Sequence, residues 1–148
     1  MTQAAARTLR LARSIPPAVH SLAQRNASLF LRIVVQDNPV DTGTARANWN
    51  TSRNAPDTTV VLISKQATHG RGSARGTRSI ARGLNTINGS RAGDSLHVTS
   101  NVFYEPFLDA GSSQQAPAGF IGAAARNSLL TQRDILNRLT LAARRAIK

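Results

Sequence analysis

The stretch PAVHSLAQRNASLFLRIVVQ, from Pro17 to Gln36, decides how this chain folds. Its apolar side chains recur every three or four residues, which is the spacing of one buried face of an amphipathic helix. Pro17 suits the first turn of a helix, and Asp37-Asn38-Pro39 is a typical end. A core-facing helix is therefore predicted over residues 17–36. Its apolar face comprises Val19, Leu22, Ala23, Ala27, Leu29, Phe30, Ile33 and Val34.

The residues before this helix predict a separate helical arm over residues 1–16. Thr2–Ser14 combines Ala and Leu with arginines three residues apart, at Arg7, Arg10 and Arg13. The prolines that follow in Ser14-Ile15-Pro16-Pro17 are predicted to break the helix, because proline lacks a backbone N–H. An Arg-rich opening without acids is also typical of a mitochondrial transit peptide, but no cleavage boundary is evident.

The segment after the helix predicts short strands. Residues 46–53 can be extended with Trp49 as their anchor, and 54–57 read as a hairpin turn. Thr58–Ser64 (TTVVLIS) is rich in β-branched residues, and its continuous apolar run predicts a strand covered on both faces. Residues 95–101 alternate apolar and polar side chains, as in a half-buried strand.

The middle and the end of the chain differ in character. Residues 65–93 read as a basic loop with a short helix at Ser79–Ile87, and the Gly-rich part lacks the pattern of a phosphate-binding loop. Residues 102–109 concentrate aromatic side chains, and Pro117 is placed to open one long final helix. The fold class predicted is α+β: N-terminal helices, a small, mostly antiparallel β-sheet of three or four strands, and a long C-terminal helix packed on it. We expect one domain over 1–148, with parts 1–16, 17–64, 65–93 and 94–148.

Composition narrows the function classes. The 148 residues carry 19 Lys and Arg against 7 Asp and Glu, a net charge of +12, and 17 of the basic residues are Arg. Guanidinium groups favour anionic partners, either nucleic acid or acidic protein surfaces. The excess is segmental: 1–36 and 64–93 contain no acid, whereas 94–111 contain Asp94, Glu105 and Asp109 without a base. Cysteine is absent, which excludes disulfides and thiolate metal sites, and apolar runs of about four residues do not predict a membrane span.

No catalytic pattern is found. His20, His69 and His97 have no His or carboxylate at ligand spacing, so no metal site is predicted. Asp41 and Asp109 each lie near a glycine at a turn, where an aspartate commonly accepts backbone hydrogen bonds rather than acting as an acid or base. No serine has the surroundings of a nucleophile elbow. We therefore expect a protein that is not an enzyme and needs no cofactor.

Two clusters are more specific than composition. The first is NPVDTGTARANW at 38–49, and the second is SNVFYEPFLDAGSSQQAPAG at 100–119. Together they resemble the neck or tail-completion proteins of long-tailed bacteriophages, the small head–tail joining family. Asp109 replaces the commoner Glu of that pattern, and Pro106 and Gly119-Phe120 also depart from it. The matching positions are Pro39, Asp41, Thr42, Gly43, Arg46, Trp49, Asn101, Tyr104, Leu108, Asp109, Gly111, Ser113 and Pro117.

The residue types of these clusters indicate structural roles. Asp41 can accept hydrogen bonds from the next backbone N–H groups, and Gly43 tolerates a positive φ, so that the chain can reverse. Arg46 is expected to pair with Asp109, and Trp49 to bury a large area on the sheet. Tyr104, Phe107 and Leu108 are expected beneath the final helix, with Gly111 releasing the chain and Pro117 starting that helix.

The resemblance implies a structural virion protein, assembled in the host cytoplasm and located at the head–tail junction. It implies a homo-oligomeric ring of six or twelve copies between the head-closure or connector proteins and the tail terminator or tail tube, with DNA passing through. A tail terminator, a head-closure ring and a sequence-independent nucleic-acid-binding protein remain alternatives. The residues predicted to face a neighbouring ring or DNA are Arg71, Arg75, Arg78, Arg82 and Arg91.

Overall fold

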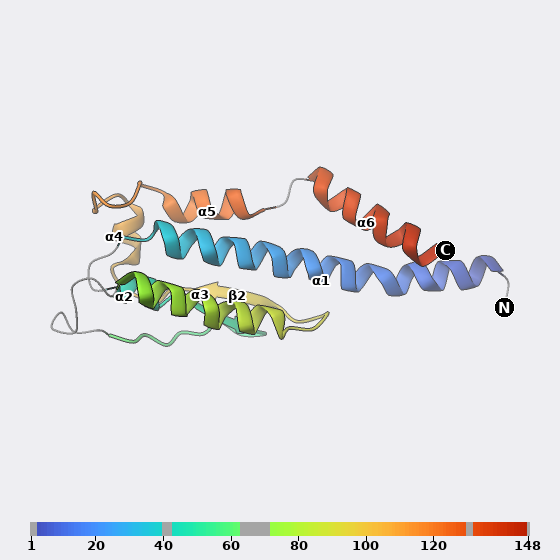
Figure 1. Cartoon of the computed structure of the whole chain (residues 1–148), viewed down its shortest axis with the longest axis horizontal. Coiled ribbons are helices and arrows are strands. Elements are labelled where there is room, and N and C mark those ends of the chain that lie inside the picture. The colour runs from blue at the N-terminus through green and yellow to red at the C-terminus, as the bar shows by residue number, and fades with distance from the viewer. Residues whose placement is uncertain (1–2, 40–42, 63–71, 130–131, 148) are drawn as a thin grey trace.

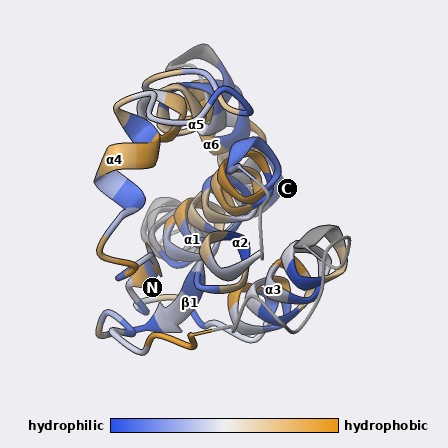
Figure 2. Cartoon of the chain, turned by 90° about the vertical axis from the view of Figure 1, so that its left-hand side faces the viewer, coloured by the Kyte–Doolittle hydropathy of each residue, from blue (hydrophilic) through white to orange (hydrophobic). Residues whose placement is uncertain are grey.

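The protein is an elongated, mainly helical molecule organised around one long helix. The computed structural model describes residues 3–39, 43–62, 72–129 and 132–147. Helices α5 and α6 lie on one side of α1, and α3 and a small sheet lie on the other (Figures 1 and 2). In chain order the elements are α1 (Gln3–Asp37), α2 (Thr44–Ala47), β1 (Asn50–Arg53), α3 (Gly72–Asn88), β2 (Leu96–Thr99), α4 (Glu105–Asp109), α5 (Phe120–Ser128) and α6 (Gln132–Ile147).

The first helix is continuous, so the predicted break between an arm and a second helix is wrong. α1 contains 35 residues with Pro16 and Pro17 in its interior. The two prolines leave the carbonyls one turn earlier without their usual N–H donors, which is a local cost. Helix α6 packs against α1, and this packing explains why tertiary structure overrides the proline signal. The predicted end of the helix, at Asp37, is confirmed.

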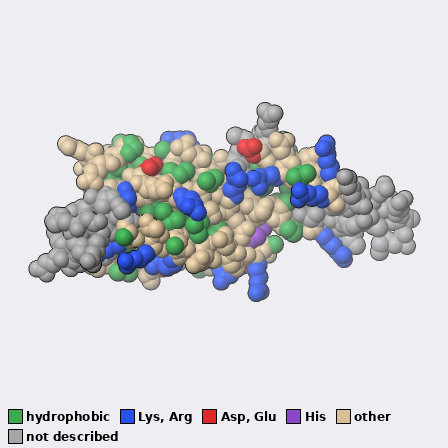
Figure 3. All heavy atoms as spheres, viewed as in Figure 1, with side chains coloured by type: hydrophobic (Ala, Val, Ile, Leu, Met, Phe, Trp, Pro, Cys, Tyr) green, Lys and Arg blue, Asp and Glu red, His purple; other side chains and the backbone are tan. Residues whose placement is uncertain are grey.

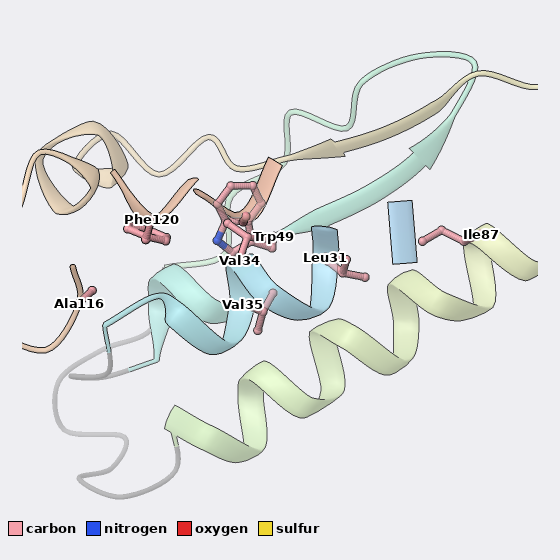
Figure 4. Packing of buried hydrophobic residues seen from close by; sticks show 8 residues of the cluster. Leu31, Val34, Val35, Trp49, Ile87, Ala116 and Phe120 are labelled. Atoms are coloured by element: carbon pink, nitrogen blue, oxygen red, sulfur yellow. The ribbon is translucent and has the colours of Figure 1, made fainter. Parts of the chain in front are cut away.

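The core lies around the C-terminal half of α1. Leu31, Val34 and Val35 are buried there, whereas Val19, predicted on the same face, is 50% exposed. Trp49 packs edge-on against Phe30, with ring centroids 5.9 Å apart. Figure 4 shows that the buried apolar side chains of α1 pack against side chains from several other segments of the chain. That cluster consists of Leu31, Val34, Val35, Trp49, Ile87, Ala116, Phe120 and Ala124.

The predicted fold class is wrong in the extent of its sheet and in its final helix. About 60% of the chain is helical, and within the described ranges the sheet has two antiparallel strands, β1 and β2. Asn50 pairs with Thr99 and Arg53 with Leu96. The predicted strand at 95–101 is confirmed in part by β2. Of the predicted extended stretch 46–53, residues 46 and 47 belong to the short helix α2, and 50–53 form β1.

The apolar segment predicted as a central strand is extended but joins no ladder where it is described. Asn48 takes the place of a partner strand: its Nδ2 donates to the Val61 carbonyl at 2.8 Å, and its Oδ1 accepts from the Val61 N–H at 2.6 Å. Asn50 Nδ2 donates to the Thr59 carbonyl at 2.8 Å. Val61 and Leu62 are 61% and 77% exposed, so the expected burial of both faces is wrong. Residues 63 and 64 lie outside the described ranges.

The predicted long C-terminal helix is replaced by two shorter ones. α5 begins at Phe120, where Gly119 has φ 73°, and ends at Leu129, whose backbone is extended. This interruption allows both helices to pack on α1, and Figure 1 shows α6 beside its N-terminal half. The apolar face of the predicted helix is weak. Two shorter helices can each turn their apolar side chains toward α1, and so bury more apolar area than one straight helix would.

The basic segment, predicted mainly as a loop, is the 17-residue helix α3 where it is described. Two glycines of α3 permit its close approach to α1. An added Cβ at Gly76 would lie 3.1 Å from Val35 Cγ1, and one at Gly83 would meet Leu31 Cδ2 and lie 2.6 Å from Thr51 Oγ1. The absence of side chains at these positions explains how a glycine-rich sequence forms a packed helix.

Gly83→Ala is therefore expected to lower the free energy of unfolding by about 1–2 kcal/mol, because overpacking outweighs the gain in helix propensity. Leu31 is fully buried and has no room to move away from the new methyl group. Urea unfolding followed by circular dichroism measures the change. Gly122→Ala in α5 is the matched control, since its nearest contact would be an ordinary 3.5 Å to Arg126. Equal or greater stability of Gly83→Ala would contradict this packing.

Candidate functional site around Glu105

The two motif clusters meet at one buried carboxylate. Asn38, just beyond the end of α1, is fully buried, and Glu105, the first residue of α4, is 4% exposed. The Asn38 amide Nδ2 donates to Glu105 Oε1. Ser100 Oγ lies 3.4 Å from the other carboxylate oxygen, at the long limit of a hydrogen bond. One oxygen of Glu105 is therefore well satisfied and the other only weakly.

The environment of Glu105 favours its neutral form. Burial raises the pKa of the Glu105 carboxyl above its usual range, and the hydrogen bonds from Asn38 and Ser100 oppose this change. The Trp49 indole N–H also lowers this pKa, although its Nε1 has no partner of normal hydrogen-bond geometry among the described residues. The nearby charge of Asp109 raises the pKa further. A cationic group that reached this carboxylate would stabilise its charged form.

A pocket opens beside the carboxylate. Its volume is about 400 Å³, and its walls include Trp49, Glu105 and Asp109. Phe103 at its rim is 81% exposed, and Phe107 of α4 is 64% exposed. Carboxylates next to aromatic rings suit a guanidinium or ammonium group, which can pair with the acid and stack on the ring.

The first motif is built partly as predicted. Gly43 has φ 81°, in the left-handed region expected of it, and precedes α2. Pro39 follows the end of α1 and is half-buried, and Trp49 is 4% exposed in the core. Asp41 and Thr42 lie outside the described residues, and the predicted Asx turn with them.

The predicted pair between Arg46 and Asp109 is wrong, because each residue has other partners. Arg46 Nε and Nη2 donate to the carbonyls of Asn38 and Gln36, both at 2.7 Å, and so satisfy the C-terminal end of α1. Burial lowers the pKa of Arg46, and the charge of Asp37 opposes this change. Asp109 Oδ1 accepts the Ile121 N–H at 2.8 Å in the first turn of α5.

The second motif forms the wall of the pocket and the connection to α5. Leu108 packs against the core as predicted, whereas Phe107 points into solvent instead of lying beneath the final helix. Tyr104 is half-buried and packs edge-on against Phe103, with centroids 5.2 Å apart. Gly111 has φ 91°, consistent with its predicted release of the chain.

Two of the remaining residues of the second motif, Asn101 and Ser113, form hydrogen bonds in its loops. Asn101 Nδ2 donates to the Asp57 carbonyl at 3.1 Å. Ser113 Oγ accepts the Gln115 N–H at 3.2 Å. Pro117 is exposed and precedes α5, which begins three residues later than predicted. The Ser113 contact is local, the Asn101 contact joins residues 44 apart in the chain, and both lie in exposed surroundings.

The predicted basic surface is a helix face. Arg75, Arg78 and Arg82 follow spacings of three and four along α3, so they share one side of it. Arg82 Nη2 lies 3.3 Å from the Ala47 carbonyl and 3.2 Å from Asn50 Oδ1, and Arg78 is exposed. Arg91 lies in the turn before β2, where its N–H donates to Asp94 at 2.8 Å. Arg71 lies outside the described residues.

Sequence reasoning missed the polar residues that organise the site. Asn38 was interpreted only as part of a helix end, and Asn48 and Asn50 as ordinary strand residues. The available signal was three asparagines close to an apolar Trp49, because buried asparagine needs specific partners. Within the described ranges no group of three His, Asp or Glu side chains is placed to hold a metal ion. His20 instead lies 3.2 Å from Ser90 Oγ, and His69 is outside those ranges.

Comparison with known proteins gives no functional assignment, so the proposal below rests on the site and on the sequence motifs. No family model, curated protein or solved structure matches the chain. In the part of the chain that the structure describes, each helix is too short or too polar to cross a membrane.

Proposed function

We propose that this chain is a structural virion protein of the tailed-phage head–tail junction, a neck or tail-completion protein that assembles as a ring between the capsid connector and the tail. Genome DNA would pass through the ring, which would form in the host cytoplasm. The observation that carries the proposal is the meeting of both motif clusters at Glu105. Residues 38–49 and 100–119 are far apart in sequence, yet Asn38 and Trp49 of one contact or flank Glu105 of the other.

The amount of exposed surface supports an assembling protein. A compact monomer of 15.8 kDa is expected to expose about 7,300 Å² of surface. This chain exposes 9394 Å², about 2,000 Å² more, whereas one partner contributes about 800 Å² to a standard interface. A subunit of this shape gains burial when it joins neighbours.

The exposed side chains support the same function. Large apolar residues lie exposed on several elements, where they are available for contact with neighbouring subunits. They are Ile15, Val19, Val60, Val61, Leu62, Phe103, Phe107, Leu129, Leu136 and Leu141. A ring subunit that also meets a ring above and a ring below needs several such surfaces.

Electron microscopy and native mass spectrometry of the purified full chain test the proposal. Closed rings of one defined stoichiometry are expected, and they should bind purified tails or DNA-filled heads that lack their junction proteins. A protein that stays monomeric at every concentration, or rings that bind neither particle, would contradict it. Binding to the tail end without the head end would instead favour a tail terminator, and the reverse a head-closure ring.

A second candidate, a sequence-independent nucleic-acid-binding protein, is favoured by the arginine face of α3. Arg75 and Arg78 on one helix side can contact successive phosphates without reading bases. Titration of duplex DNA at several salt concentrations separates the two functions. An affinity that falls steeply with the logarithm of salt, and that drops in Arg78→Glu but not in the exposed Arg53→Glu control, would favour the binder.

A further inference from the structure

We propose that copies of this chain associate head to tail, the α4 end of one copy binding the α6 end of the next, with an arginine of α6 entering the pocket beside Glu105. This inference deepens the proposed function and rests on it for the choice of a second copy as partner. It names the surfaces through which the copies meet, and it is testable without any phage particle.

The α4 end is acidic and aromatic. Residues 92–125 contain Asp94, Glu105 and Asp109 and neither Lys nor Arg, in a chain whose net charge is +12. Two of these acids line the 400 Å³ pocket, and Phe103 and Phe107 stand exposed beside it. The α4 end thus combines exposed apolar area with negative charge, which is the usual character of a surface that binds a basic partner.

The pocket holds a buried carboxylate oxygen that has only a weak hydrogen bond. Glu105 is 4% exposed, yet its Oε2 has only the 3.4 Å contact to Ser100. Trp49 is 4% exposed and lines the pocket, and its Nε1 has no hydrogen-bond partner among the described residues. Buried polar atoms are normally satisfied, so the weakly bonded Oε2 of Glu105 marks a place where a further hydrogen-bond donor fits. A guanidinium supplies N–H donors for this carboxylate oxygen and a flat face that can stack on the Trp49 ring, but it has no acceptor for the indole N–H.

The α6 end carries the complementary chemistry. Leu141, Arg144 and Arg145 are exposed and lie at spacings of three and four, so they share one side of the last turns of α6. Arg138 continues this side one turn earlier and is also exposed. In Figure 3 basic side chains gather where α6 lies over α1. Leu141, which is 50% exposed, provides an apolar contact for the two phenylalanines.

The two surfaces lie at opposite ends of the molecule. Figure 1 shows α4 at one end of α1, and the C-terminal end of α6 at the other. A contact between different surfaces of identical chains repeats from copy to copy and closes into a ring when the rotation allows it. Two matching ends meeting each other would give only a dimer. The acidic pocket beside α4 and the basic last turns of α6 lie at opposite ends of the molecule, and their opposite charges therefore favour the repeating arrangement.

Mixing two variants tests this geometry. Phe103→Ser/Phe107→Ser disables the α4 end, and Arg144→Glu/Arg145→Glu disables the α6 end; all four side chains are exposed, so folding should be preserved. Each variant alone is expected to be monomeric by native mass spectrometry, and their mixture to give a 1:1 heterodimer that grows no further. Arg25→Glu/Arg32→Glu, with the same charge change on exposed positions of α1, should assemble like the unmodified chain.

The outcomes separate this contact from the proposed function. A dimer of the Arg144→Glu/Arg145→Glu variant alone would overturn the inference, because the α4 ends would then bind each other. Rings that persist in either variant would also overturn it while leaving the head–tail function standing. A heterodimer in the mixture, with no rings from the unmodified chain, would support the contact and refute the ring. An unmodified chain that remains monomeric would overturn both.

Discussion

Trp49→Ala is expected to lower the free energy of unfolding by about 3–5 kcal/mol, because removing a buried indole forfeits its burial and leaves a cavity. Trp49 is 4% exposed and packs edge-on against Phe30 of α1. It also forms a wall of the Glu105 pocket. Since small domains are stable by only about 5–15 kcal/mol, this loss approaches unfolding. Urea or thermal unfolding followed by far-ultraviolet circular dichroism measures it.

Trp49→Phe is the control that separates the ring from its N–H. The Nε1 atom has no hydrogen-bond partner of normal geometry among the described residues, so phenylalanine should retain most of the packing. We expect Trp49→Phe to cost under about 2 kcal/mol, as for other apolar replacements of moderate volume change. An equal loss in both variants would show that the indole N–H, and not the aromatic area, stabilises this site.

The parts of the fold that sequence predicted correctly are those set by local patterns. The 17–36 helix has an apolar residue in nearly every turn, and its end at Asp37 follows from an adjacent Asn-Pro. β2 follows from alternation over a few residues. Gly43 is predicted to reverse the chain because glycine tolerates a positive φ, and Gly111 to release the chain from the second motif; both adopt a positive φ. Each of these features is decided within one or two helical turns of chain.

The errors arose where distant contacts overrule local preference. Pro16 and Pro17 predict a break, but α6 packs along this region and α1 continues. Val60–Leu62 have high β-propensity, but Asn48 satisfies the backbone of Val61 that a partner strand would otherwise bind. The glycines of α3 predict a loop, but at Gly83 they allow contact with Leu31. None of these partners is evident from spacing along the chain.

The sequence predicts several residues of the candidate site, but it does not predict the contacts between them. Residue type and pattern single out Trp49 and the acids of 94–111, and of these Trp49, Glu105 and Asp109 line the pocket. The contact that joins the clusters, Asn38 to Glu105, spans 67 residues. Arg46 and Asp109 were expected to form that link, because opposite charges are the simplest pair to propose. Buried amide–carboxylate contacts leave no such signal.

Asn38→Leu is expected to destabilise the protein by about 2–4 kcal/mol at neutral pH, because it leaves a buried carboxylate without its main donor. Leucine keeps the branching of asparagine but is larger and has no donor, so the variant loses the bond to Glu105 Oε1 and adds a packing cost that a Glu105→Gln background shares. Urea unfolding of the full chain measures this cost. The same substitution in a Glu105→Gln background should cost about 1 kcal/mol, since a neutral amide tolerates a lost hydrogen bond better.

The dependence of that cost on pH identifies the buried charge as its cause. Burial raises the pKa of Glu105 above its ordinary 4.5, so the folded state binds the proton more tightly than the unfolded chain. Stability from this group is therefore complete below 4.5 and is lost as pH rises through the folded-state pKa. Asn38→Leu removes a bond that lowers this pKa, so its penalty should grow across the same window and be smallest in acid. Glu105→Gln should abolish that dependence. A penalty independent of pH would mean that Asn38 stabilises the protein by packing, with no contribution from the Glu105 charge.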